Sequence, residues 1–296
     1  DGKKSFTHKI IGNKDDGMGH LYRALALAHD ITDHEILFIC DSDNEVAVNQ
    51  LAGYDYWLGV YEKNNIVENI IKLKPDLVIN DILSTRLEDV IPLKDIGIKV
   101  AGFEDLGPGA VHSDLIINEL YEINQVNGGN ILWGHHYFFL RDEFHDAVKH
   151  GFKDDIDEIL LAFGGTDQLN LSSIIFHLIR DVCKQKKIKI NIVTGPGYKN
   201  FKKLESAVKA DSLVSLTRST GVISSIMEKS QIAITSNGRT LYELAHLNIP
   251  AIVISQHKRE DSHEFASREN GFIPISIFKE GESEEKVLEE LTLLIE

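Results

Sequence analysis

Residues 158–167 read EILLAFGGTD, and this stretch decides the fold that the rest of the chain repeats. The unbroken apolar run predicts a fully buried strand over residues 158–163, of the kind found in parallel sheets. Two glycines follow the strand, and a helical pattern begins at Leu169. A buried strand that passes through a glycine turn into a helix is the first half of a βαβ unit. The stretch therefore predicts an α/β fold with a parallel sheet.

The same alternation of strand and helix runs through the chain twice. Helices are expected at residues 20–31 and 65–73, and an amphipathic helix at 283–295. A chain of 296 residues is long enough for two cores. We therefore expect two Rossmann-like domains, residues 1–150 and 151–296, joined by the charged stretch 141–157. The other expected strands are residues 8–12, 35–40, 76–80, 99–103 and 114–117 in the first half and 189–194, 213–216, 231–235 and 251–255 in the second.

The bulk composition argues against several classes of protein. A formal net charge of −15 is unsuited to a nucleic-acid surface, whose affinity comes largely from Lys and Arg on phosphates. No apolar run reaches the length of about 18 residues that a membrane span needs. The first residues lack both a Met and the apolar core of a secretory signal, which favours a processed end or a piece of a longer chain. Cys40 and Cys183 lie in separate apolar stretches, as reduced core residues of a cytoplasmic protein do.

The turn after the first strand carries the first candidate site. Residues 13–23 read NKDDGMGHLYR. Gly17 and Gly19 let the backbone approach a ligand, and the helix N-terminus that they open favours negative charge. His20 stands in the first helical turn at the carboxyl edge of the sheet, and Arg23 shares its face of the helix. Taken alone, a tight connection with a structural histidine explains this turn as well.

Two further glycine turns follow strands of the second half. The turn after residue 163 predicts a diphosphate cradle of backbone N–H groups, or a plain turn that Thr166 or Asp167 caps. Residues 234–244, ITSNGRTLYEL, offer N–H groups and hydroxyls to phosphate, and Glu243 is suited to accept from ribose hydroxyls unless it is a solvated helix residue. The candidate nucleotide-binding residues are Gly164, Gly165, Thr166, Asp167, Gly195, Ser236, Asn237, Gly238, Arg239, Thr240 and Glu243.

Taken in order, these motifs resemble those of a known family. GxGHxxR, then FGGTDxxNL, then SNGRTxYEL with a following IPxI resemble the UDP-sugar hydrolase of pseudaminic acid biosynthesis. They resemble more distantly the GT-B glycosyltransferase that makes the lipid-linked disaccharide of peptidoglycan. The resemblance runs from about residue 9 to residue 272 and includes residues 76–81, 103–106, 114–118 and 134–144. It implies a GT-B fold, in which the active site lies in the cleft between two Rossmann-like domains.

The resemblance also implies a reaction. In that family the histidine of GxGH activates water for attack at the anomeric carbon of a UDP-linked diacetamido-trideoxy sugar, so His20 becomes the candidate base. An imidazole with an ordinary pKa of about 6.5 can accept a proton at neutral pH. Neither a metal nor a cofactor is expected, since the histidines, including His135 and His136, lack metal-ligand spacing. The residues expected to face the sugar are Asp16, Gly17, Gly19, Arg23, Asp81, Glu104 and Asp105.

The chain departs from the family at two places on the sugar side. The family's Arg and Asp ahead of GxGH are replaced by residues 13–16, NKDD. Its Asp-Asp with a following Arg appears as Glu104-Asp105 with no Arg nearby. The sugar, or the reaction itself, can therefore differ. These changes resemble hydrolase-like domains appended to sialic-acid-type cytidylyltransferases, so a fused or associated cytidylyltransferase domain is an expected partner.

Other functions fit the same motifs. In a GT-B glycosyltransferase His20 would serve an acceptor hydroxyl, and residues 51–60 are the only loosely apolar candidate for a lipid-acceptor patch, which an ordinary strand explains as well. A hydrolysing nucleotide-sugar epimerase shares the fold. A binding domain that has lost turnover would have little need of His20. In each case the expected partner is a nucleotide sugar, and neither a nucleic acid nor a membrane.

Overall fold

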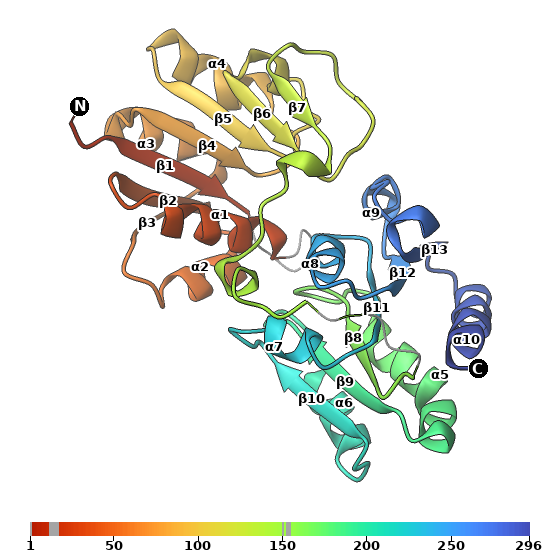
Figure 1. Ribbon diagram of the computed structural model, residues 1–296. Helices are drawn as coiled ribbons and strands as arrows, with labels where there is room; N and C mark the ends of the chain where they lie inside the picture. The colour runs from red at the N-terminus through yellow and green to blue at the C-terminus, as the bar shows by residue number, and fades with distance from the viewer. Residues whose placement is uncertain (1, 12–17, 150, 152–154) are drawn as a thin grey trace. The chain divides into compact units, whose positions relative to one another are not determined.

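The computed structural model describes residues 2–11, 18–149, 151 and 155–296 (Figure 1). The chain divides into two compact units, Asp1–Phe139 and Leu140–Glu296. This division precedes residue 150, where the composition places the domain boundary. Residues from Leu140 onward belong to the second unit. Phe144 is fully buried, and its backbone carbonyl lies 3.0 Å from Nε2 of His246 in that unit. Contacts between residues far apart in the sequence thus accompany a boundary that lies nearer the N-terminus than expected.

The first unit is a doubly wound parallel sheet. Its seven described strands follow the order β3-β2-β1-β4-β5-β6-β7, and every neighbouring pair is parallel. An order that starts at a central strand, runs to one edge and then returns to the other is the Rossmann arrangement. The strands are β1 (Ser5–Ile10), β2 (Glu35–Asp41), β3 (Trp57–Tyr61), β4 (Leu77–Asp81), β5 (Lys99–Phe103), β6 (Leu115–Asn118) and β7 (Ile131–Trp133). The helices are α1 (Gly19–Asp30), α2 (Glu45–Leu51), α3 (Ile66–Leu73) and α4 (Leu87–Asp95).

Helices cover both faces of this sheet, and β2 shows why. Its side chains alternate between the faces, as strand geometry requires. Phe38 and Cys40 pack with residues of α1 and α2, whereas Ile39 packs with residues of α3 and α4. A strand that is apolar on both sides in this way belongs to a sheet buried on both faces.

The second unit repeats the plan with six described strands in the order β10-β9-β8-β11-β12-β13, again all parallel. Its largest core cluster joins β8 to α5, α6 and α10, through residues such as Leu161, Phe176 and Leu291. The strands are β8 (Glu158–Ala162), β9 (Lys189–Thr194), β10 (Val214–Arg218), β11 (Ile232–Ser236), β12 (Ala251–Ser255) and β13 (Phe272–Ile277). The helices are α5 (Leu171–Lys186), α6 (Phe201–Val208), α7 (Ser224–Met227), α8 (Thr240–His246), α9 (Lys258–Asp261) and α10 (Glu282–Ile295).

The differences from the sequence-based expectation lie at sheet edges and strand ends. The edge strands β3, β7 and β13 are absent from the expected strands. Residues 51–60, which include most of β3, fit an apolar patch and an ordinary strand equally well. β7 has only three residues, and β13 contains Pro274, which edge strands tolerate. The first strand begins at Ser5 and ends at Ile10, earlier than residues 8–12. Four of its six residues, Ser5, Thr7, His8 and Lys9, are polar, so this strand lacks the apolar run that marks β8.

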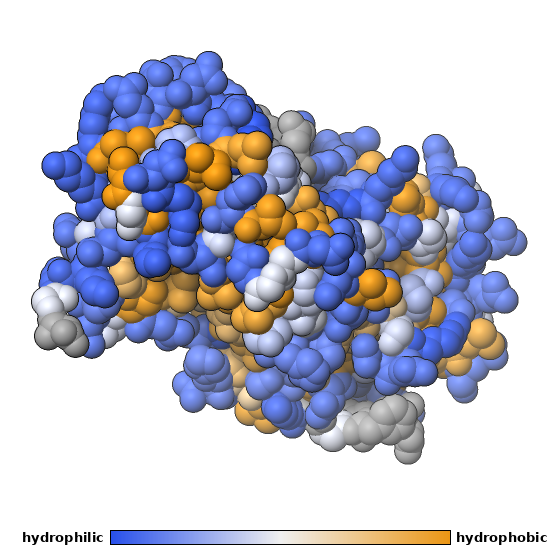
Figure 2. All heavy atoms as spheres, turned by 90° about the horizontal axis from the view of Figure 1, so that it is seen from above, coloured by the Kyte–Doolittle hydropathy of each residue, from blue (hydrophilic) through white to orange (hydrophobic). Residues whose placement is uncertain are grey.

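The surface and the remaining core agree with an ordinary globular chain. The face in Figure 2 is mostly hydrophilic, with apolar side chains in smaller groups. Cys40 and Cys183 are both buried and carry no disulfide. In the part of the chain that the structure describes, no helix is long and apolar enough to cross a bilayer.

Candidate functional site

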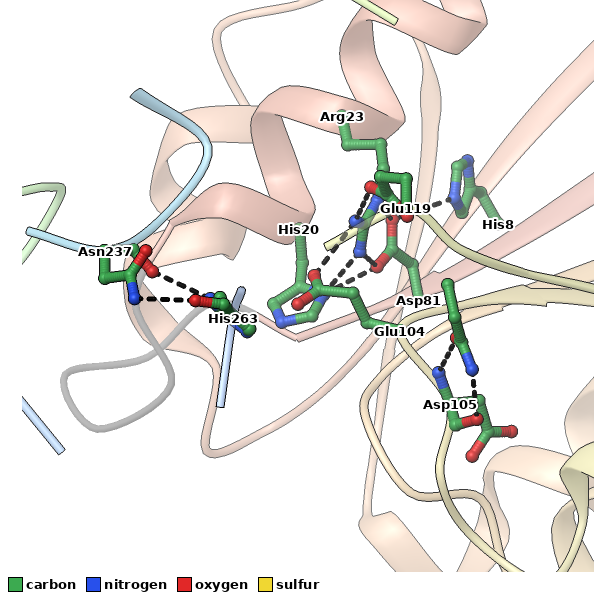
Figure 3. Close-up of polar contacts among 10 residues, drawn as sticks. His8, His20, Arg23, Asp81, Glu104, Asp105, Glu119, Asn237 and His263 are labelled. Carbon is green, nitrogen blue, oxygen red and sulfur yellow. Dashed lines mark hydrogen bonds and ion pairs between the residues drawn. The ribbon is translucent and has the colours of Figure 1, made fainter. Parts of the chain in front are cut away.

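A buried cluster of charges surrounds Arg23 of α1 in the first unit (Figure 3). Arg23 donates from Nε to Asp81 Oδ2 at 2.9 Å and from Nη2 to Asp81 Oδ1. Its Nη1 lies 2.9 Å from Glu104 Oε2 and 2.5 Å from Glu119 Oε1. Asp81 ends β4, Glu104 follows β5, and Glu119 follows β6. Three strand ends therefore converge on one guanidinium at the carboxyl edge of the sheet, where such folds bind ligands.

The cluster is electrostatically unusual because almost none of it reaches solvent. Arg23, Asp81 and Glu119 are fully buried, and Glu104 is 5% exposed. Burial alone lowers the pKa of Arg23, but the facing carboxylates of Asp81, Glu119 and Glu104 raise it well above its usual value. Burial alone raises the pKa of Asp81, but Arg23 and His20 hold it well below its usual range. The cluster thus keeps Asp81 ionised inside the protein.

His20 forms a dyad with Asp81. Its Nδ1 lies 2.6 Å from Asp81 Oδ1, and the residue is 4% exposed. Arg23 Nη2 also approaches Nδ1, at 3.0 Å, but Arg23 can only donate. We assign the Nδ1 proton to the shorter contact, so that His20 donates to Asp81. This tautomer leaves Nε2 as a proton acceptor, the arrangement by which a carboxylate orients a histidine base.

The loop after β5 holds Glu104 in place. Glu104 has a φ of 50°, a left-handed conformation that side chains other than glycine seldom adopt. The next residue, Asp105, accepts from the backbone N–H groups of Thr85 and Gly107, both at 2.8 Å. Its own N–H donates to Asn118 Oδ1 at 2.8 Å. The sequence predicts that Asp105 faces the sugar, but its carboxylate accepts hydrogen bonds from the backbone of the surrounding loops. We therefore assign Asp105 the role of positioning Glu104.

The other sugar-side candidates have different outcomes. Gly19 is the first residue of α1, directly before His20. Asp16 and Gly17 lie outside the described residues. His8 of β1 approaches Asp81 from another direction, with Nε2 3.8 Å from Oδ2. The sequence analysis does not single out His8 or Glu119. Glu119 lies two residues beyond the predicted strand 114–117 and directly follows β6, which extends to Asn118.

The glycine turn after β8 in the second unit is shaped by Asp167. The Asp167 carboxylate accepts from the N–H groups of Leu171 at 2.7 Å and Ser172 at 2.9 Å, so it caps α5. Gly164 and Asp167 have φ values of 76° and 42°. Burial raises the pKa of Asp167 against the opposing effect of these bonds from Ser172 and Leu171. Since the cap uses these N–H groups, a phosphate here would meet the backbone of residues 164–166 and not the end of α5.

Gly195 supports the same turn from the end of β9. A Cβ at this position would lie 2.3 Å from Gly165 O and 2.3 Å from Gly165 Cα, closer than atoms can pack. The backbone N–H of Gly197 donates to Gly165 O at 3.0 Å. Gly195, expected to contact nucleotide, is thus required by the contact between two backbones.

The turn after β11 is held by Asn237. Its Nδ2 donates to the carbonyls of Glu260 at 2.8 Å and His263 at 2.9 Å, and its own carbonyl lies 2.7 Å from His263 Nδ1 (Figure 3). Ser236 ends the strand and Thr240 begins α8, with Gly238 and Arg239 between them. The turn is therefore anchored on one side, while its backbone bonds, from Gly238 N to Ser236 O and Leu241 N to Gly238 O, stay local.

Glu243 of α8 is neither solvated nor isolated. It is 6% exposed, and Arg141 donates to its Oε1 from both Nε and Nη2 at 2.8 Å. Burial raises its pKa, and the charges of Arg141 and Arg239 partly oppose that rise. Solvation on a helix surface is therefore excluded for Glu243.

Besides the turns after β8 and β11, a polar residue after β12 lies at the carboxyl edge of the second sheet, and the sequence analysis does not single it out. Gln256 follows β12, and its Nε2 donates to Phe163 O at 3.2 Å. The N–H of Gln256 donates to Glu260 Oε2 at 2.7 Å, and burial raises the pKa of Glu260 to about 7.

Among the described residues, no group of three or more His, Cys, Asp or Glu side chains is arranged to hold a metal ion.

The sequence has two similar curated proteins, and no family model matches it. It is 26% identical to the uncharacterised protein MJ1062 of Methanocaldococcus jannaschii over 83% of this chain and 54% of that protein, so the chain spans about half of that relative's length. It is 24% identical to the spore coat polysaccharide biosynthesis protein SpsG of Bacillus subtilis, over 87% of this chain and 79% of that protein.

Solved structures resemble the whole chain in fold. Acinetobacter baumannii MurG superposes with a TM-score of 0.62 at 12% identity, covering 99% of this chain and 91% of its own. The Methanocaldococcus jannaschii UDP-GlcNAc 2-epimerase, in complex with UDP-GlcNAc and UDP, has a TM-score of 0.56 at 14% identity, covering 99% and 92%. At these identities the likeness concerns architecture. The chain therefore has the α/β fold of GT-B type, built from two Rossmann-like parallel-sheet domains.

Proposed function

We propose that this protein is an enzyme that acts on a UDP-linked sugar and hydrolyses the bond between the anomeric carbon and the diphosphate. Two comparisons support the substrate class. A protein of the same fold binds UDP-GlcNAc and UDP, and a relative of similar sequence belongs to polysaccharide biosynthesis. The motifs that resemble a UDP-sugar hydrolase support the reaction, with a diacetamido-trideoxy sugar as its substrate. A fused or associated cytidylyltransferase domain stays a prediction.

The nucleotide end is assigned to the second unit. Backbone N–H groups of Gly164, Gly165 and Thr166 and the residues from Ser236 to Thr240 would bind the diphosphate, since amides presented by a turn form an anion-binding concavity. Glu243 would accept from the ribose hydroxyls. We assign Asp167, Gly195 and Asn237 an indirect role. They shape the two turns that would bind the diphosphate, through hydrogen bonds of Asp167 and Asn237 and a close backbone contact of Gly195.

The reaction is assigned to His20. Water would give a proton to His20 Nε2 as its oxygen bonds to the anomeric carbon, and the electron pair of the breaking C1–O bond would pass to the β-phosphate oxygen of the departing UDP. The imidazolium formed at His20 is stabilised by Asp81, which is held ionised by Arg23. General base catalysis of this kind accelerates a reaction by about 10²- to 10⁴-fold.

The single observation that carries this proposal is the 2.6 Å contact between His20 Nδ1 and Asp81 Oδ1. A buried dyad that leaves Nε2 basic is suited to activating water. Turnover of UDP-sugars in ¹⁸O-water tests it. We expect label in the free sugar at C1 and none in UDP. Label in a phosphate would identify a pyrophosphatase instead, and a requirement for an acceptor would identify a glycosyltransferase.

A hydrolysing UDP-sugar epimerase is a second candidate, favoured by the carboxylates around Arg23. Epimerisation at C2 needs groups that remove and return a carbon-bound proton, and Glu104 and Glu119 lie beside the dyad. The two reactions differ in heavy water. An epimerase would place deuterium at C2 of its product, whereas hydrolysis at C1 leaves C2 unlabelled.

A further inference from the structure

The segment that opens the second unit is fastened to α7 and α8. Glu143 Oε2 accepts from the N–H of Ser224 at 2.9 Å, and His246 Nε2 lies 3.0 Å from Phe144 O. The N–H of Val148 donates to Glu228 at 2.8 Å. Residues 141–148 are thus bound at several points to the two helices that follow β10 and β11.

Arg141 is the point at which this segment reaches the proposed ribose-binding residue. Its Nη1 lies 2.9 Å from Glu143 Oε1, and its guanidinium lies over the ring of Phe144, 5.4 Å from the centroid. Its Nε and Nη2 both meet a single oxygen of Glu243, Oε1, at 2.8 Å. A guanidinium held by three partners keeps Oε1 of Glu243 in one place, because the spacing of its donors is rigid.

We infer that Arg141 is the positioning residue for ribose recognition, holding Glu243 by Oε1 so that Oε2 faces the two ribose hydroxyls of the nucleotide. This inference rests on the proposed function. It explains how the nucleotide site would distinguish a ribose from a deoxyribose. A carboxylate bonds hydroxyls most strongly when it is ionised and fixed. Arg141 supplies both conditions, although its own side chain would not touch the ribose.

The charges around Glu243 give the inference a pH signature. Arg141 and Arg239 favour its ionised form, whereas burial and the nearby Glu143 favour its protonated form. Removal of Arg141 therefore raises the pKa of Glu243 further. UDP affinity should then fall at a higher pH, as acidification protonates Glu243 earlier.

Calorimetry with UDP and 2′-deoxy-UDP over a pH series tests this on the whole chain. Arg141→Met should weaken UDP binding about tenfold or more, the effect of losing a fixed charge-assisted bond. It should also reduce the preference for UDP over 2′-deoxy-UDP and move the acidic loss of affinity to higher pH. Arg141→Lys keeps the charge but loses the fork, so its pH profile should stay near that of the wild type while the preference falls. If Arg141→Met does not fold, Arg141→Lys alone decides through the preference.

Arg180→Met is the matched control, because Arg180 also lies over a phenylalanine in the second unit, 5.7 Å from the ring centroid of Phe176. It should bind as the wild type does. A wild-type protein that binds no UDP overturns the proposed function and this inference with it. A wild type that prefers UDP, with Arg141 variants that keep the same preference and pH profile, overturns the inference alone. Equal losses for both nucleotides with an unmoved pH profile also overturn it, since they indicate general loosening.

Discussion

Asp81→Asn is the substitution that separates the dyad from a structural histidine. The change preserves volume but replaces one of the two carboxylate oxygens by an NH₂ group. Arg23 donates to both oxygens of Asp81, and His20 Nδ1 lies 2.6 Å from one of them. An amide offers a single acceptor to these donors. Its oxygen is drawn toward Arg23, and its NH₂ group then faces His20. His20 must accept at Nδ1, so its proton moves to Nε2 and the base is lost.

The expected magnitude has a catalytic part and a stability part. Loss of the base should lower kcat by about 10²- to 10⁴-fold, with little change in KM. Removing one partner of a buried ion pair costs about 3–5 kcal/mol when the other charge is left alone. Here Arg23 keeps Glu104 and Glu119, so the loss should lie at or below the lower end of that range. A domain stability of about 5–15 kcal/mol leaves Asp81→Asn folded.

The assay is the release of UDP and free sugar, followed together with thermal unfolding. Asp114→Asn is the control, since Asp114 also pairs with two cations, Lys94 and Lys99, but at the surface of the same unit. It should retain full kcat. An Asp81→Asn enzyme that is folded and turns over at the wild-type rate would refute the dyad, and with it the choice of His20 as base.

The remaining predictions concern the second unit, the phosphates and acid stability. Glu243→Ala should abolish most UDP affinity while His20→Ala leaves it nearly intact, and calorimetry giving the reverse order would contradict the division between the units. Turnover should continue in excess chelator, because the diphosphate is assigned to amide donors, and a strict magnesium requirement would point to another mechanism. Gly195→Ala should cost about 1–3 kcal/mol by overpacking against Gly165, whereas Gly221→Ala, whose Cβ meets nothing within 4 Å, should be nearly neutral in denaturant unfolding. Burial raises the pKa of Asp89, but Lys9 and Arg86 lower it from 3.8 to about 2, so its stabilisation of about 2 kcal/mol is present above roughly pH 4 and lost as the pH falls through 2. Asp89→Asn should therefore flatten the acid limb of the unfolding curve, and an unchanged limb would contradict that pKa.

The central strands could be predicted from the sequence because their signal is local. The run at residues 158–163 is apolar on both faces, and the glycines that follow mark the strand exit without any knowledge of the fold. The edge strands β3, β7 and β13 carry no such signal. Trp57 and Val60 of β3 are exposed, β7 has only three residues, and β13 contains Pro274. The boundary after Phe139 could not be predicted either, because this segment contacts residues far away in the sequence, as Phe144 O contacts His246 Nε2.

The sequence predicts most residues of the charged cluster around Arg23, but not which of them form hydrogen bonds or ion pairs with one another. His20 lies in the first turn of α1 with Arg23 on the same helix face, Asp81 ends β4 and Glu104 follows β5, so their positions predict one sheet edge. The spacing says nothing about which carboxylate meets which nitrogen, and it does not reveal Glu119. No local pattern connects Arg141 with Glu243 either. Arg141 precedes β8, whereas Glu243 lies in α8. Such partners are selected by the folded backbone.

The contact between Gly195 and Gly165 bears on how glycine motifs are interpreted. A Cβ at Gly195 would meet backbone atoms of residue 165, so Gly195 cannot take a side chain unless the turn after β8 is rerouted. A glycine near a predicted phosphate site is commonly counted as evidence of ligand contact, yet Gly195 would be obligatory in a protein that never met a nucleotide. Gly195 therefore records the close approach of the end of β9 to the turn after β8. A motif score that counts it as a sign of phosphate binding counts a packing requirement instead.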